Sequence, residues 1–484
     1  MDDVLGWFTS GGGSFDHSSV GFTEFPDCGR GAVALQDIPE GHVLFKIPRE
    51  LLLSTDTSGL PQLIGLTCWK EKMSVGWVGL ILCMMWETAQ GSSSKWSKYL
   101  ESLPTTFDTP MLWSDEDLGE LKGTSVVDKL GKADAERDFK EKLLPLVESR
   151  PDIFPSETMP IYYTLEMFHV MGSRILSRSF DVEKDDPEET REDGAADTSL
   201  GSAMDVDAQQ NEAEPADNEE SETVPDGDPE EDDDEASGVS MIPLADMLNA
   251  RYGSENAKLF YEKDALGMVS TKSIKAGEQL WNTYGDLPNA ELLRRYGHVD
   301  MLPLPNGDVG NPGDIVEIRA DIAVDVLHTA AKVTKERIDW WLEQGGDDVL
   351  VLETDLEIPL ALVSLVRLLR LSPDEWEQAV AKDRVPKPKL DGEILAVVAA
   401  VLERRLSEYP TTLATDLELF CDETMPRNKK HALIVRIGEK RILQGAFNKV
   451  RAQMELEAQK ANGSKKRKVP SDDEADRSSK TRRR

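Results

Sequence analysis

Hydrophobic and polar residues near the N-terminus alternate with a period of two, which is typical of β-strands. Between Gly21 and Ser54 the chain reads GFTEFPDCGRGAVALQDIPEGHVLFKIPRELLLS, and the alternation is interrupted at CGRG and at PEG. Glycine-rich interruptions of this kind mark tight turns between short strands. The pattern therefore predicts a β-structure built from short strands and glycine turns.

The apolar pattern takes a helical period after about Leu60 and keeps it to Phe180. Apolar residues return three and four positions apart in WVGLILCMMWETA, DAERDFKEKLLPLVES and YTLEMFHVMGSRILSRSF. Strand and turn patterns resume in SMIPLADMLNA and in AKLFYEKDALGMVSTKSIKAGEQLWNTYG. A block of helices, over residues 55–165, is therefore expected inside a β-rich domain.

Helical patterns dominate again from about Pro305, for example in PLALVSLVRLLRLS and EILAVVAAVLERRLSEY. In SPDEWEQ, Ser372 is a predicted N-cap and Pro373 the first helical residue. We expect an α+β protein with a β-rich domain over residues 20–304, an all-helical domain over 305–460 and a disordered basic tail over 461–484.

Charge along the chain is distributed unevenly. Residues 181–238 contain 25 Asp and Glu but only two basic residues, and so carry −23 of the total net charge of −36. This segment has almost no aromatic residues and cannot bury enough apolar surface to offset the entropy cost of ordering. We expect it to be a disordered acidic loop within the first domain.

The sequence argues against a secretory signal, a membrane span and a metal site. The N-terminus lacks the basic segment and apolar core of a signal peptide. The longest apolar run, Val75 to Trp86, is too short to span a bilayer and is expected to be a buried helix. The four cysteines have no metal-ligand spacing, so we expect reduced thiols and no metal site. The glycine fingerprints of dinucleotide and nucleoside triphosphate sites are also missing.

Three short motifs contain candidate binding residues. Two glycines in Gly29–Gly31 would let the backbone come close to a ligand, although a plain hairpin turn is the simpler interpretation. Arg174 and Arg178 would by default lie on a solvated helix face. Asp246 and Asn249 are three residues apart and would share one face of a helix. Because the residues around them are apolar, their polar groups need hydrogen-bond partners, either backbone amides in a structural cap or a ligand.

Two tyrosines, Tyr284 and Tyr296, stand twelve residues apart in NTYGDLPNAELLRRYGHV, and each precedes a glycine. We find no serine–histidine pair, cysteine–histidine pair or metal-type cluster that would accompany them. Taken alone, they would be core tyrosines whose hydroxyl groups reach polar partners.

The order of these motifs is more specific than any one of them. With a helical insertion after the first, the chain contains in order GRGAVALQDIPEGHVLFKIP, SRSF, PLADMLNA and NTYG…NAELLRRYGHV. This order resembles the SET-domain lysine methyltransferases of the branch that includes the Rubisco large-subunit methyltransferase and SET domain-containing protein 6. It is most like the fungal ribosomal-protein methyltransferases, and WSKYLESLPTTFDTPMLWSDEDLGELKGT resembles the insertion of that branch. The resemblance covers residues 20–455 without the acidic segment.

The resemblance implies that S-adenosylmethionine is the cofactor. The positions that match the family's cofactor-binding residues are Gly29, Arg30, Gly31, Arg178, Phe180, Asp246, Asn249, Ala250, Tyr284 and Tyr296. Tyr284 also matches the catalytic tyrosine. Many relatives have Asn-His where this chain has Asn249 and Ala250, so adenine packing is expected to differ there.

Methyl transfer explains how a site could work without a covalent nucleophile. The methyl sulfonium is already an electrophile, whereas a lysine amine with a pKa near 10.4 is only about 0.04% neutral at pH 7, a deficit of about 4.6 kcal/mol. A channel lined by aromatic rings desolvates the ammonium and lowers its pKa. The Tyr284 hydroxyl would then orient the amine for attack.

The expected substrate is a basic ribosomal protein of the large subunit, because an acidic enzyme attracts a basic partner. Alternatives are a histone or another nuclear protein, a histidine instead of a lysine, and a catalytically silent acidic scaffold for basic proteins. No nucleic-acid or membrane partner is expected. Lys465, Lys466, Arg467 and Lys468 predict a nuclear import receptor and a nuclear protein, with a nonspecific polyanion-binding tail as the alternative.

Overall fold

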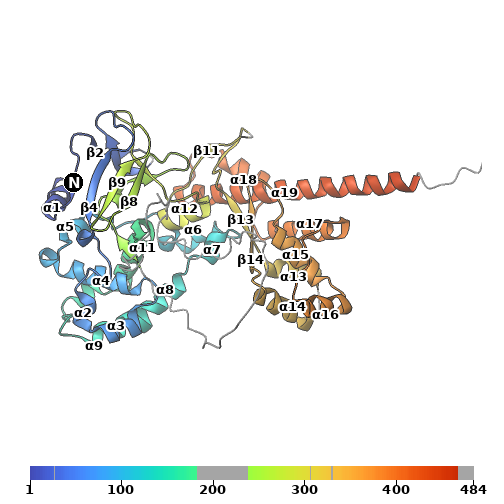
Figure 1. Ribbon diagram of the computed structural model, residues 1–484, viewed down its shortest axis with the longest axis horizontal. Coiled ribbons are helices and arrows are strands. Elements are labelled where there is room, and N and C mark those ends of the chain that lie inside the picture. Colours follow the sequence, from blue (N-terminus) through green and yellow to red (C-terminus); the bar gives the residue numbers. More distant parts are fainter. Residues whose placement is uncertain (27, 183–237, 306, 329–330, 467–484) are drawn as a thin grey trace, which may run out of the picture. The chain divides into compact units, whose positions relative to one another are not determined.

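The computed structural model describes residues 1–26, 28–182, 238–305, 307–328 and 331–466 (Figure 1). These residues form two compact units. The first contains Met1–Ser114 and Asp128–Leu302, and the second contains Asp115–Val127 and the chain from Pro303 onward. No helix among the described residues is long and apolar enough to cross a membrane. The predicted α+β class is confirmed.

The largest sheet described in the first unit is four-stranded and antiparallel, in the order β1-β4-β9-β8, and Figure 1 labels three of its strands, β4, β9 and β8. Its strands are β1 (Ser14–Phe15), β4 (Val43–Pro48), β8 (Ala257–Tyr261) and β9 (Ala265–Ser270). In β8, Ala257 and Leu259 are buried whereas Phe260 between Leu259 and Tyr261 is exposed, as the period of two requires. The predicted strand pattern therefore corresponds to a sheet with one face in the core.

Three two-stranded sheets complete the β-structure of the first unit. They are the antiparallel pair β2 (Val20–Phe25) and β3 (Gly29–Ala34), the antiparallel pair β5 (Ser179–Asp181) and β6 (Val239–Met241), and the parallel pair β7 (Asn249–Ala250) and β10 (Trp281–Asn282). In the second pair, Phe180 lies opposite Ser240, and the Val182 N–H donates to the Gly238 carbonyl at 2.9 Å. The two ends of the acidic segment thus meet within the first unit, while residues 183–237, and the prediction made for them, lie outside the described residues.

The described part of the first unit contains ten α-helices, which surround the sheets or form the predicted insertion. They are α1 (Asp2–Ser10), α2 (Leu60–Ile64), α3 (Leu66–Met73), α4 (Val78–Ala89), α5 (Ser97–Ser102), α8 (Lys132–Asp138), α9 (Leu144–Ser149), α10 (Met159–Tyr162), α11 (Leu165–Arg178) and α12 (Asn289–Tyr296). Shorter turns are η1 (Arg49–Leu51), η2 (Gly91–Ser93), η3 (Pro110–Leu112), the π-helical η4 (Phe139–Leu143) and η6 (Ala245–Met247).

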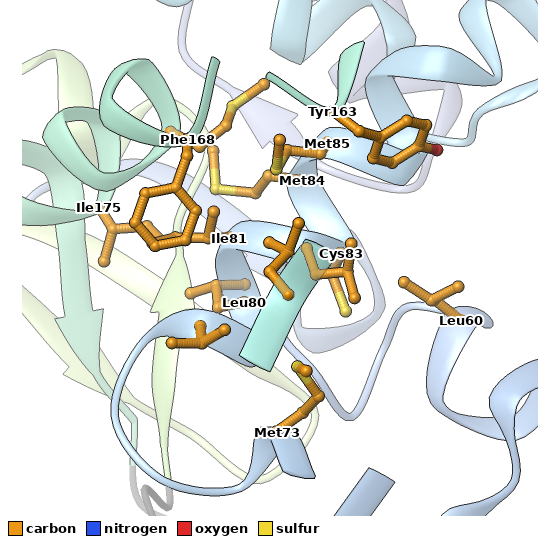
Figure 2. Close-up of a cluster of buried hydrophobic side chains, with 14 of the residues drawn as sticks. Leu60, Met73, Leu80, Ile81, Cys83, Met84, Met85, Tyr163, Phe168 and Ile175 are labelled. Carbon is orange, nitrogen blue, oxygen red and sulfur yellow. The ribbon is translucent and has the colours of Figure 1, made fainter. Parts of the chain in front are cut away.

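The insertion has its own hydrophobic core around α4 (Figure 2). The residues from Val78 to Met85 are all buried, and Phe168 and Ile175 of α11 belong to the same cluster. A helix that is apolar on every side must be buried on every side. The apolar run that is too short for a membrane is therefore the central helix of this core.

The second unit is mainly helical. Its helices are α6 (Asp115–Gly119), α7 (Ser125–Asp128), α13 (Ala320–Leu327), α14 (Ala331–Glu343), α15 (Leu360–Leu369), α16 (Pro373–Ala381), α17 (Gly392–Leu406), α18 (Leu413–Phe420) and α19 (Arg427–Lys466). The predicted N-cap of α16 is confirmed, because Ser372 and Glu375 form a reciprocal capping box. Helix α19 continues six residues past the predicted limit of 460, and the tail from residue 467 lies outside the described residues.

The second unit also contains strands, which the prediction of an all-helical domain omitted. Strand β13 (Ile315–Arg319) pairs antiparallel with β14 (Val349–Glu353), and the short strands β11 (Leu302–Pro303) and β12 (Val309–Gly310) precede them. Each is five residues or shorter and lies between long helical patterns. Such short runs are hard to distinguish from helix ends or loops by periodicity alone.

Residues Asp115–Val127 pack in the second unit, although the sequence placed them in the helical insertion of the first. Arg436 of α19, only 2% exposed, donates to the Glu120 carbonyl at 2.6 Å and pairs with Asp416 at 3.2 Å. Lys440 is also buried and pairs with Asp416 at 2.5 Å. Buried charges need such partners. Hydrophobic periodicity predicted helices here correctly but could not indicate which core they join.

Candidate active site

The Gly29–Gly31 motif forms the turn and the start of β3 in the β2–β3 hairpin. Gly29 has a φ of +68°, a conformation that favours glycine. A Cβ atom on Gly31 would lie 2.7 Å from Nδ2 of Asn249 and 2.7 Å from Nε2 of Gln279. The motif is therefore a hairpin turn, and it is also a place where two side-chain amides approach the backbone closely.

The segment from Asp246 to Ala250 runs along this hairpin. Nδ2 of Asn249 donates to the Arg30 carbonyl at 3.2 Å, which joins the segment to the glycine motif. Asp246 lies in the 3-10 turn η6, and Asn249 begins strand β7. The two residues therefore do not share a helix face, because the chain changes from a turn to a strand between them.

Arg178 at the end of α11 binds the same segment. Its Nη1 donates to the Asp246 carbonyl at 2.5 Å and lies 3.9 Å from Oδ2 of the Asp246 carboxylate. Arg174, one turn earlier, is only 4% exposed and donates to the Pro104 carbonyl at 3.0 Å. The default interpretation of a solvated arginine face is therefore wrong for Arg174, because α11 packs against α4 of the insertion core, whereas the Arg178 side chain stays 29% exposed.

Tyr284 and Tyr296 are stacked, with ring centroids 4.1 Å apart and planes at 7°. The Tyr284 hydroxyl donates to the Leu248 carbonyl at 3.3 Å. Burial raises the pKa of Tyr284 well above its ordinary value, and the neighbouring Tyr296 adds to this effect. Tyr284 therefore stays a neutral phenol throughout the physiological pH range. Tyr284 thus contacts both Tyr296 and the segment that holds Asp246.

The parallel pair β7–β10 explains how these residues meet. Asn249 lies opposite Trp281, and Ala250 lies opposite Asn282. Tyr284, two residues after β10, consequently reaches the Leu248 carbonyl just before β7. A small pocket is lined on this side by Ala250 and Tyr284.

Phe180 is the candidate cofactor-binding residue that follows Arg178 in the chain. It is half-buried in β5, two residues after Arg178, and packs against the core of the β-structure. Its position beside Arg178 follows from the direct passage of α11 into β5. Its role in binding the cofactor stays a prediction.

Arg178 and Asp246 suit the amino-acid end of S-adenosylmethionine, which carries a carboxylate and an ammonium group. Nε of Arg178 and Oδ1 of Asp246 are buried, and neither has a hydrogen-bond partner among the described residues. Burial raises the pKa of Asp246 to about 6, an effect that the Arg178 guanidinium and the Tyr99 hydroxyl oppose. A cationic donor and a carboxylate acceptor are thus left for complementary ligand groups.

Two side chains at this site were missed by the sequence interpretation. Tyr99 donates to Oδ2 of Asp246 at 2.9 Å, and the Gln279 amide lies against Gly31. Tyr99 belongs to the WSKYLESLP stretch, which resembles the insertion of the family branch. Neither residue stands in a pattern that indicates a ligand, so only the folded chain reveals them.

Comparison with protein families identifies the architecture. The profile of the SET domain matches residues 29–285, which is more than half of the chain and includes the glycine motif and Tyr284. The chain belongs to the SET-domain family. A second profile, Rubisco LSMT substrate-binding, matches residues 328–443 in the second unit of this SET-domain protein.

Curated relatives of this SET-domain protein are methyltransferases by name. Ribosomal lysine N-methyltransferase 4 of Saccharomyces cerevisiae is 32% identical over 321 residues, which cover 64% of this chain and 56% of that protein. N-lysine methyltransferase setd6 of Danio rerio is 28% identical over 461 residues, covering 86% of this chain and 87% of that protein. The match to the yeast protein thus spans less than two thirds of its length, whereas the zebrafish match is nearly complete.

Solved structures with the same fold include Rubisco LSMT bound to AdoMet, with a TM-score of 0.64 at 18% identity over 98% of this chain and 97% of that one. The SET domain of LSMT bound to lysine and AdoHcy gives a TM-score of 0.63 at 19% identity, over 94% and 91%. The predicted family branch, the enzyme class of protein-lysine methyltransferase and the cofactor S-adenosylmethionine are confirmed at the level of the family. The roles of the individual site residues stay predictions.

Replacing Gly31 by alanine tests the close approach at the glycine motif. The new Cβ would displace the Asn249 and Gln279 amides, and the hydrogen bond from Asn249 to Arg30 would be lost. We expect S-adenosylmethionine affinity, measured by calorimetry, to fall about tenfold, whereas unfolding free energy should fall by only about 1 kcal/mol because both amides end flexible side chains.

Gly41→Ala is the matched control, because Gly41 has a φ of +79° and nothing within 4 Å of an added Cβ. It should cost about 1 kcal/mol in stability through backbone strain and leave cofactor affinity unchanged. Equal cofactor binding by the Gly31 variant and the wild type would contradict the role given to this motif.

Proposed function

We propose that this SET-domain protein transfers a methyl group from S-adenosylmethionine to a lysine of a basic protein, and that a ribosomal protein is the preferred substrate. The observation that carries the proposal is the meeting of Tyr284 with the Asp246–Ala250 segment, opposite the Gly29–Gly31 motif. This arrangement joins a neutral phenol, a buried carboxylate and a backbone cradle in one place.

Tyr284 acts in this proposal as an orienting group and not as a base. Its raised pKa keeps the hydroxyl protonated, and the hydrogen is directed to the Leu248 carbonyl. The phenol oxygen keeps lone pairs that can accept a hydrogen bond from an amine N–H. An amine held this way has its own lone pair fixed in direction, which is catalysis by positioning.

The cofactor supplies an electrophilic methyl group, and the protein supplies binding and orientation. Arg178 Nε and Asp246 Oδ1 would hold the carboxylate and the ammonium of its amino-acid part. With the cofactor bound, the stacked rings of Tyr284 and Tyr296 would help to exclude water next to the phenol oxygen. Exclusion of water disfavours the charged form of a lysine and so lowers its pKa, which increases the neutral fraction that can react.

Charge supports a basic substrate. The chain carries a net charge of −36, most of it between residues 181 and 238, and opposite charges speed encounter and disfavour acidic competitors. The name of the yeast relative adds a ribosomal protein to the classes of substrate to test. Together they favour a ribosomal protein over other basic proteins.

The substrate class can be tested with radiolabelled S-adenosylmethionine and two protein mixtures, ribosomal proteins and core histones from the same cells. We expect label in a band of the large ribosomal subunit, on lysine after hydrolysis. Label confined to histones would contradict the ribosomal substrate and favour a histone. Label on histidine would contradict lysine as the acceptor residue. A chain that binds the cofactor but labels neither mixture would favour the scaffold alternative.

Tyr284→Phe removes one hydroxyl and keeps the ring that stacks on Tyr296. If the phenol oxygen orients the amine, kcat should fall on the order of 10²-fold, the scale of losing one preorganised polar contact. Cofactor affinity should change much less. Single-turnover methylation and calorimetric binding of the cofactor separate the two effects, and a wild-type kcat in the folded variant would refute the catalytic role.

Tyr296 gives the matched comparison, because it shares the stack but is not expected to touch the amine. Tyr296→Phe and Tyr296→Ala should act chiefly by weakening cofactor binding. The alanine variant should also lower the melting temperature, since it leaves a cavity beside the Tyr284 ring. If Tyr296→Phe lost kcat as strongly as Tyr284→Phe, the two roles would not be separable.

We further propose that Lys465, Lys466, Arg467 and Lys468 bind a nuclear import receptor. Truncation of a fluorescent fusion after Asn462 removes this cluster. The expected result is a shift of the fusion from the nucleus to the cytoplasm, measured by microscopy. Nuclear accumulation that persists in the truncated fusion would contradict the import function and leave nonspecific polyanion binding.

A further inference from the structure

Tyr99 contacts the candidate active site from the helical insertion. It lies in α5, its side chain is fully buried, and its hydroxyl donates a hydrogen bond of 2.9 Å to Oδ2 of Asp246. The two residues are 147 positions apart in the chain. The insertion thus supplies a hydrogen-bond donor directly to a carboxylate that lies beside Arg178.

One tryptophan packs on the ring of Tyr99, and a second anchors the residue before α5. The Tyr99 ring stacks on Trp7 of α1, with centroids 6.1 Å apart and planes at 12°. Nε1 of Trp7 donates to the Lys95 carbonyl at 2.7 Å, and Nε1 of Trp96 donates to the Leu51 carbonyl at 2.9 Å. The stacked Trp7 ring and the anchored start of α5 therefore restrict where the Tyr99 hydroxyl can lie relative to Asp246.

The groups that face Asp246 come from three elements. Arg178 of α11 and Tyr99 of α5 contact the carboxylate, and Tyr284 after β10 lies close enough for its phenol to be influenced by the same charge. Arg174 lies one turn before Arg178, and its positive charge partly offsets the rise that burial causes in the pKa of Tyr99. Arg178, the Tyr99 hydroxyl and the backbone N–H groups of Leu244 and Asp246 favour the ionised carboxylate, against the effect of burial.

A purely structural role explains this arrangement poorly. A buried tyrosine hydroxyl can be satisfied by a backbone carbonyl, whereas a buried carboxylate is a costly partner unless all its oxygen atoms are bound. Here Oδ1 of Asp246 and Nε of Arg178 have no partner among the described residues. A buried charge that is held on one side and left open on the other is typical of a ligand site.

We propose that Tyr99 is a positioning residue of the methyl-transfer site. Its hydroxyl fixes the Asp246 carboxylate so that Oδ1, together with the Arg178 guanidinium, receives the amino-acid part of the cofactor. This inference rests on the proposed function, in which Asp246 and Arg178 hold S-adenosylmethionine. It gives the helical insertion a direct part in cofactor binding.

Tyr99→Phe keeps the buried ring and removes only the donor. The ionised form of Asp246 loses a hydrogen bond, so its pKa must rise and the carboxylate must accept a proton at a higher pH. Cofactor binding needs the ionised form, so the pH at which half of the affinity is lost should rise by about one unit. At pH 7 the affinity should fall about twofold, and well below pH 6 the loss should approach tenfold.

The experiment is calorimetric titration of the full-length protein with S-adenosylmethionine between pH 5.5 and 8, for the wild type, Tyr99→Phe and Tyr163→Phe. Tyr163 is the matched control, because it is also a buried tyrosine of the insertion core and packs edge-on against Phe154. The control should keep the wild-type affinity and the wild-type pH dependence. In Asp246→Asn the loss of cofactor affinity at acidic pH should disappear. Adding Tyr99→Phe to this variant should lower the affinity no further.

The outcomes separate this inference from the proposed function. If the wild type binds no cofactor, the proposed function fails and takes this inference with it. If the wild type binds and Tyr99→Phe keeps both the affinity and the pH midpoint, Tyr99 is structural and only this inference fails. Should Tyr99→Phe not fold, Trp7→Phe loosens the stacked ring and keeps the hydroxyl. A shift of the midpoint is then expected, and an unchanged midpoint overturns the inference.

Discussion

The pairing of β7 with β10 is the contact on which the candidate site depends. Two parallel residue pairs, Asn249 with Trp281 and Ala250 with Asn282, bring the segments before and after them into register. A shift by one residue would turn every side chain of the strand to the other face. Tyr284 would then lose the Leu248 carbonyl, and the stacked tyrosines would no longer lie beside the segment that holds Asp246.

Burial of one charge sets the chemistry around this contact. The Asp246 carboxylate is removed from water, and its pKa rises to about 6 although Arg178 and Tyr99 oppose the shift. Removal from water also keeps Tyr284 protonated. The same desolvation thus leaves a carboxylate that can accept a cationic ligand group and a phenol that can orient an amine. Desolvation costs stability, which is typical of sites built for a ligand.

The helical parts of the chain do more than enclose the sheets. The insertion core around α4 supports α5, which carries Tyr99, and α11, which carries Arg174 and Arg178. The second unit has its own core and also takes up residues 115–127 through the buried contacts of Arg436. Helices that are adjacent in sequence therefore belong to different cores.

The sequence alone predicted the family, the main elements of the first unit and a set of candidate site residues. Strand and helix periods are local properties, so the strands around Gly29–Gly31 and the buried helix α4 could be predicted from neighbouring residues. The order of the motifs identified the SET fold and the positions that match its site. Only the tertiary structure decided that Arg174 is buried, that residues 115–127 join the second unit and that Tyr99 binds Asp246. The physical reason is that these depend on contacts between residues far apart in the chain, which no local pattern of polar and apolar residues records.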